Sequence, residues 1–100
     1  MQINYTEDGA VQEFSLGGKL DHESYSDFDQ LIQSNYQKGQ DVILNLEQLT
    51  YISSVGLRSF IGLAKLVRND KKQIKIKATD GSMVKKIILL SGFAKIMPFI

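Results

Sequence analysis

The segment VILNLEQLTYISSVGL, at residues 42–57, carries the strongest indication of the fold. Four of its first five residues, VILNL, are β-branched or aliphatic, which is typical of a strand buried within a sheet. A polar stretch then leads to two hydroxyl residues, Ser53 and Ser54, whose side chains can cap the free N–H groups at the start of a helix. A buried strand that leads into a helix predicts an α/β layer protein.

The flanking segments extend this alternation in both directions. Period-2 patterns predict strands, period-3.6 patterns predict helices, and Gly, Asp and Ser mark the ends. The predicted elements are strands at 2–6 and 10–16, a helix from Asp21 or His22 to Lys38-Gly39, the strand at 42–46, a helix from Ser53-Ser54 to Asn69-Asp70, a strand around Ile74 and Ile76, a helix from Ser82 to Ser91-Gly92, and an edge strand from Lys95 to Ile100. The order β-β-α-β-α-β-α-β predicts one α/β domain over residues 1–100, with a mixed β-sheet covered mainly on one side by helices.

Composition excludes several classes of function. The chain has no cysteine and one histidine, His22, which excludes a disulfide framework, a thiol nucleophile and a zinc site built from Cys and His. We therefore expect no metal and no cofactor. The longest uninterrupted apolar run is Ile87 to Leu90, and no export signal is recognisable. These features predict a cytoplasmic protein without membrane insertion.

Charge is divided unevenly between the two halves of the chain. Residues 1–50 hold nine acidic residues against two basic ones, and residues 51–100 hold ten basic residues against two acidic ones. Such a separation steers charged partners toward particular faces. Direct nucleic-acid binding is not expected, because the basic residues are spread over several elements without an aromatic platform or a known DNA-binding spacing. Nothing in the composition demands a dimer, so we expect a monomer when the protein is free.

The serine pair at the start of the second predicted helix is the first candidate site. A phosphate on Ser53 or Ser54 would be stabilised by the helix N-terminus, but spacing alone favours one serine as an N-cap and the other as a loop hydroxyl. Gly56 lies inside the first helical turn, where it indicates either close approach of a partner or tight internal packing. Arg58, one turn after Ser54, is positioned to contact a phosphate or to remain solvated.

The stretch Gly17-Gly18-Lys19-Leu20-Asp21-His22 is the second candidate site. It lacks the spacing of a phosphate-binding loop. If its strand lies beside the central strand in a parallel sheet, Asp21 approaches Ser54 at the carboxyl edge, where α/β proteins place their ligand sites. A serine hydrolase is an alternative from another class. It would require His22 within hydrogen-bond reach of Ser53 or Ser54.

Taken together, these stretches resemble a known family. The segments GKLDH at 18–22, LNL at 44–46 and YISSVGLR at 51–58, with VKKI at 84–87 and SGF at 91–93, resemble the STAS domain of bacterial anti-sigma factor antagonists over nearly the whole chain. The family motif is typically Asp-Ser-Ser/Thr-Gly-Leu. Here Ser53 stands where that motif has aspartate, and Val55 stands where it often has a second hydroxyl residue.

The resemblance implies a STAS-like fold and a switch between partners. The unphosphorylated antagonist would bind an anti-sigma factor serine kinase, phosphorylation would release it, and a PP2C-type phosphatase would reset it. By this likeness the acceptor is Ser54, with Ser53 as the alternative, and Asp21 is the supporting acid. Residues Ser53, Ser54, Val55, Gly56 and Arg58 would contact the partner. The protein would be a kinase substrate and not an enzyme. The alternative is a STAS subunit of a transporter or stress-sensing complex that is not phosphorylated.

Overall fold

The computed structural model describes residues 1–100 and folds them into one sheet with helices. Local signals explain most of its elements, since strands alternate buried and exposed side chains and two helices begin at serine caps. The elements are β1 (Gln2–Glu7), β2 (Val11–Leu20), α1 (Tyr25–Asn35), β3 (Asp41–Ile52), α2 (Ser54–Asn69), β4 (Ile74–Lys77), α3 (Met83–Ser91) and the short 3₁₀ helix η1 (Phe93–Lys95).

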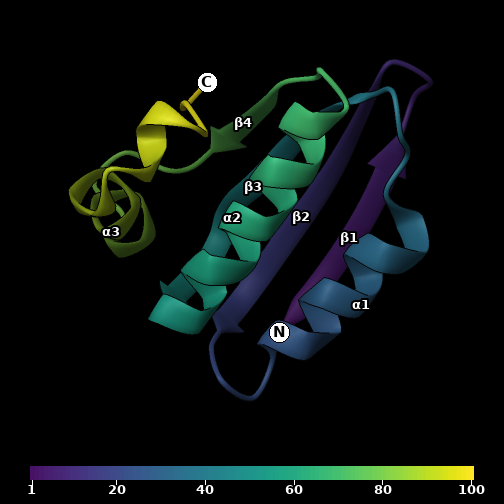
Figure 1. Cartoon of the computed structure of the whole chain (residues 1–100). Helices are drawn as coiled ribbons and strands as arrows, with labels where there is room; N and C mark the ends of the chain where they lie inside the picture. The colour runs from purple at the N-terminus through teal and green to yellow at the C-terminus, as the bar shows by residue number, and fades with distance from the viewer.

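The four strands form a mixed sheet in the order β1-β2-β3-β4. β1 pairs antiparallel with β2, whereas β2, β3 and β4 run parallel. Helices α1 and α2 lie side by side across one face of the sheet, and α3 lies at the β4 end (Figure 1). The predicted α/β class and mixed sheet are confirmed. No helix is both long and apolar enough to cross a membrane.

Much of the core lies between the sheet and helices α1 and α2, and Val84 and Ile88 of α3 also belong to it. Phe28 of α1 and Phe60 of α2 are fully buried and meet edge to face, with ring centroids 5.4 Å apart. Beneath them lie apolar side chains of the strands, among them Phe14 of β2 and Leu44 of β3. This packing fixes the starts of α1 and α2 above neighbouring strands, and thereby positions the candidate site.

Both central strands are longer than the sequence indicated. The predicted break at Gly17-Gly18 is wrong, because β2 continues to Leu20 and pairs with β3, which itself continues to Ile52. Register shifts on either side of Gly17 and Gly18 accommodate the glycines, and Gly18 has a positive φ of 86°. Such irregularities let a glycine remain within a sheet.

Helix α1 is shorter than predicted. Asp21 does not begin it, since the chain first forms a turn in which the Asp21 carbonyl oxygen accepts hydrogen bonds from the N–H groups of Ser24 and Tyr25. The helix ends at Asn35, three residues before Lys38.

The predicted strand from Lys95 to Ile100 is also wrong as a strand. Residues 93–95 form η1, and only one parallel bridge joins Phe99 to Ile76. In this bridge the N–H of Ile76 donates to the Pro98 carbonyl, and the N–H of Ile100 donates to the Ile76 carbonyl. Proline has no N–H, so residue 98 offers only an acceptor, which limits how far the pairing extends.

Tyr36, just after α1, joins the ends of the two covering helices. Its hydroxyl donates to Asp70 Oδ2 at 2.6 Å. Burial, followed by the hydrogen bond to Asp70 and its charge, raises the pKa of Tyr36 well above its ordinary value. The unfolded chain therefore releases this proton first, so the stabilisation is complete below about pH 10 and is lost as the pH rises beyond it.

We expect Tyr36→Phe to lower the free energy of unfolding at pH 7 by about 1–2 kcal/mol. The variant should also lose less stability between pH 9 and 11 than the wild type, as measured by urea unfolding across that range. Part of the alkaline decline should remain, because burial also raises the pKa of Tyr5. An unchanged alkaline slope in the variant would contradict the role assigned to Tyr36.

Candidate functional site

The candidate site lies at the carboxyl edge of the sheet, where β2 and β3 end together. Leu20 and Ile52 are the last paired residues of these strands, and the N–H of Ser53 donates to the Leu20 carbonyl at 2.9 Å. The parallel pairing places Asp21 and Ser53 next to each other along this edge. The two candidate segments of the sequence therefore meet at this edge, as predicted.

The two serines have different environments. Ser53 is the N-cap of α2, and its hydroxyl accepts a hydrogen bond from the N–H of Gly56 at 3.3 Å. Ser54 is the first residue of the helix, is exposed, and its hydroxyl has no hydrogen bond within the chain. The first intrahelical bond runs from the Leu57 N–H to the Ser53 carbonyl, which leaves the N–H groups of Ser54 and Val55 outside the helical ladder. Ser54 is thus a free hydroxyl at the positive end of a helix.

Asp21 directs its carboxylate into its own turn. Oδ1 accepts hydrogen bonds from the N–H of Glu23 at 3.0 Å and from the Ser24 hydroxyl at 3.2 Å. The bond from Glu23, followed by those from Ser24 and the charge of Lys19, lowers the pKa of Asp21, so the group is ionised at neutral pH. No hydrogen bond joins it to Ser53 or Ser54. Asp21 therefore contributes a fixed negative charge at the site edge.

Gly56 is explained by packing inside the chain. It is buried, and a Cβ built on it would lie 2.8 Å from Leu20 Cγ and 2.9 Å from Ile52 Cγ1. Only a glycine lets α2 start so close to the ends of β2 and β3. Of the five residues assigned to the partner contact, Gly56 is the one that the structure turns inward.

His22 and Arg58 lie on the outer side of the site. His22 is exposed in the turn before α1 and forms no hydrogen bond with Ser53 or Ser54, so the arrangement required for a hydrolase is not formed. Arg58 is exposed on α2 and forms no ion pair. No group of three His, Asp or Glu side chains is placed to hold a metal ion.

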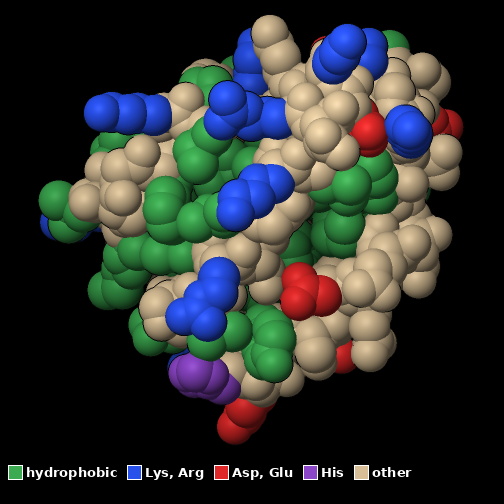
Figure 2. Space-filling model, in the orientation of Figure 1, with side chains coloured by type: hydrophobic (Ala, Val, Ile, Leu, Met, Phe, Trp, Pro, Cys, Tyr) green, Lys and Arg blue, Asp and Glu red, His purple; other side chains and the backbone are tan.

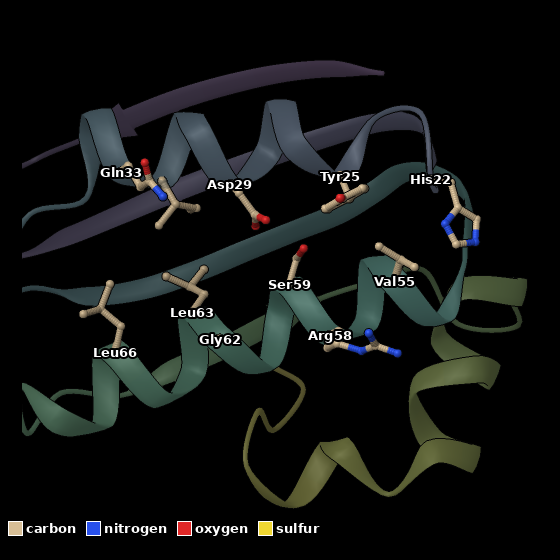
Figure 3. Close-up of a pocket in the computed structure, with 11 residues that line it drawn as sticks. His22, Tyr25, Asp29, Gln33, Val55, Arg58, Ser59, Gly62, Leu63 and Leu66 are labelled. Carbon is tan, nitrogen blue, oxygen red and sulfur yellow. The ribbon is translucent and has the colours of Figure 1, made fainter.

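A groove runs from this edge along the line between α1 and α2, with a volume of about 430 Å³. Figure 3 shows side chains from both helices pointing toward each other across it. The lining residues are His22, Tyr25, Asp29, Ile32 and Gln33 on one side, and Val55, Arg58, Ser59, Gly62, Leu63 and Leu66 on the other.

The sequence did not reveal this groove. Helical spacing places Tyr25 and Leu66 on the apolar faces of their helices, yet Tyr25 is 37% exposed and Leu66 is 39% exposed. The one feature of the sequence that could have indicated the groove is Gly62, a glycine in the middle of a helix that the sequence does not explain.

Comparison with known proteins places this geometry in a family. The STAS domain model matches residues 2–100. The chain belongs to the STAS domain family. The anti-sigma-B factor antagonist of Staphylococcus aureus strain NCTC 8325 / PS 47 is 29% identical over 77 residues, which covers 76% of this chain and 71% of the relative. The same protein from strain COL matches equally.

Two solved structures share the STAS fold of this chain. A crystal structure of an anti-sigma factor antagonist from Mycobacterium paratuberculosis has a TM-score of 0.85 at 17% identity, covering 98% of this chain and 83% of the other. The anti-sigma factor antagonist SpoIIAA in its unphosphorylated form has a TM-score of 0.79 at 18% identity, covering 99% of this chain and 88% of the other. The recognition made from the sequence motifs is confirmed at the level of the family.

Proposed function

We propose that this STAS protein is a cytoplasmic anti-sigma factor antagonist that works by switching partners. In its unphosphorylated form it binds an anti-sigma factor that is also a serine kinase, and phosphorylation of Ser54 releases it. A PP2C-type phosphatase restores the binding form. The names of the staphylococcal relatives support the class of function, and the protein is in this view a substrate and not an enzyme.

The observation that carries the choice of acceptor is the contrast between the two serines. The Ser53 hydroxyl is engaged in capping α2, whereas the Ser54 hydroxyl is exposed and free. In the transfer, a new P–O bond forms between Ser54 Oγ and the γ-phosphorus of ATP, and the bond from that phosphorus to the bridging oxygen breaks. ADP leaves with the bridging oxygen, and the hydroxyl proton passes to solvent. The phosphate adds about −1.5 to −2 charges beside the N–H groups of Ser54 and Val55, which form no intrahelical hydrogen bond.

The proposed contact surface consists of the exposed parts of the α2 start. Ser54 and Arg58 are exposed, and Ser53 and Val55 are half-buried. Apolar side chains are exposed on this face next to basic ones (Figure 2). A phosphate in the middle of such a surface must be desolvated when the partner binds, and the ionised Asp21 adds repulsion from the same edge. Release therefore needs no rearrangement of the backbone.

The experiment is phosphorylation by the anti-sigma factor kinase encoded in the same genome. The chain is incubated with the kinase and ATP, and phosphopeptides covering residues 50–58 are located by tandem mass spectrometry. We expect one phosphate, on Ser54, and none in the Ser54→Ala variant. Phosphate on Ser53 would move the acceptor by one residue. A chain that binds its partner but is never phosphorylated would instead favour a subunit of a transporter or stress-sensing complex.

A further inference from the structure

The groove between α1 and α2 reaches from the exposed surface down to the core. Its floor includes Ile32 and Leu63, which are 7% and 3% exposed, while Tyr25 and Leu66 remain more than one third exposed on its walls. Tyr25 belongs to α1 and Leu66 to α2, two helices that lie side by side on the sheet (Figure 1), so the groove runs between them. Exposed apolar side chains around a concave surface are typical of an interaction site.

The spacing of the groove residues indicates the shape of what it would hold. Both helices present residues that alternate four and three positions apart, namely Val55, Ser59, Gly62 and Leu66 on α2, and Tyr25, Asp29 and Ile32 on α1. Residues three and four positions apart lie on one face of a helix, so each helix presents one continuous strip to the groove. A groove with apolar side chains from both strips is complementary to the apolar face of a third helix.

Gly62 gives a second, independent observation. Glycine inside a helix is unfavourable relative to alanine, and its presence usually has a packing or functional reason. Gly56 has such a reason inside the chain, but Gly62 has none, since a Cβ built on it meets no atom within 4 Å. Because Gly62 lies in the groove wall, its missing side chain leaves room for a backbone that approaches from outside.

We infer that this groove receives an amphipathic α-helix of the anti-sigma factor, packed closely against α2 at Gly62. The inference deepens the proposed function and rests on it for the identity of the partner. The helix places its apolar stripe on Ile32, Leu63 and Leu66. The unpaired guanidinium of Arg58 at the Ser54 end of the groove selects an acidic side chain on that helix.

The test compares stability and binding in the same variants. Gly62→Ala should raise the melting temperature by about 2–6 °C, because alanine favours the helix and meets no obstacle. The same variant should bind the anti-sigma factor at least about tenfold more weakly by calorimetry, and Gly62→Leu should bind more weakly still. Gln30→Ala is the control, since Gln30 is exposed on α1 and lies outside the groove.

Hydrogen exchange of the wild-type complex supplies the second measurement. The groove-lining segments of α1 and α2 should gain protection on binding, and a helical segment of the anti-sigma factor should gain it with them. Unchanged affinity in both Gly62 variants, or no protection of α1, would overturn the groove assignment while leaving the Ser54 switch intact. Absence of any binding by the wild type would overturn the switch and the groove together.

Discussion

Ser54→Glu should bind the anti-sigma factor about 100-fold more weakly than Ser54→Ala, a difference that corresponds to about 2.7 kcal/mol. The glutamate places a carboxylate at an exposed position in the centre of the proposed contact surface. Binding must then remove water from the added carboxylate, with the ionised Asp21 at the same edge. Alanine removes the hydroxyl without adding charge, so its affinity should remain close to that of the wild type.

A change in the stability of the folded chain does not explain this expected loss of affinity. A negative charge in the first turn of α2 is favourable for the helix, so Ser54→Glu should be at least as stable as Ser54→Ala in thermal unfolding. Ser34→Glu is the matched control, because it adds the same charge at an exposed position near the end of α1, away from the Ser54 edge. Isothermal titration calorimetry measures all three variants. Equal affinities for the Glu and Ala variants at position 54 would rule out electrostatic release.

The second large effect concerns Gln12, a polar side chain that is fully buried beneath the end of α1. Its Nε2 donates to the Gln37 carbonyl at 2.7 Å, and its Oε1 accepts from the Gln37 N–H at 2.7 Å. One side-chain amide thereby satisfies both main-chain groups of a residue in the connection between α1 and β3. This connection helps to fix α1 over the sheet, and hence one wall of the groove.

We expect Gln12→Met to lower the free energy of unfolding by about 3 kcal/mol. Methionine has nearly the same shape, so the loss comes from the main-chain N–H and carbonyl of Gln37, each of which costs about 1–3 kcal/mol when left unpaired. Gln37→Ala is the control: it keeps that main chain and should change stability by less than about 0.5 kcal/mol. Urea unfolding compares the two. A loss below 1 kcal/mol in Gln12→Met would mean that water replaces the amide.

The positions of the candidate residues in the fold were largely predictable because their signals are local. Ser53 caps a helix through a hydrogen bond to a residue three positions later, and the same relation holds for Ser82 and Lys85. A hydroxyl before a run of helical spacing therefore identified both helix starts. The parallel placement of Asp21 beside the serines also followed, since strands joined by a helix run parallel.

The sequence by itself determined the α/β layers, the capped starts of α2 and α3 and the buried central strand, because these depend on residues close together along the chain. The tertiary structure alone decided what depends on distant partners. Gln12 meets Gln37 across 25 residues, and β2 continues through its glycines because β1 pairs with Gly17 and β3 pairs with both Gly17 and Gly18. The tertiary structure also distinguishes the two glycines of α2. Packing against Leu20 and Ile52 constrains Gly56, whereas nothing within the chain constrains Gly62. Periodicity shows which face of a helix is apolar, but only the packed helices show how much of that face stays open to a partner.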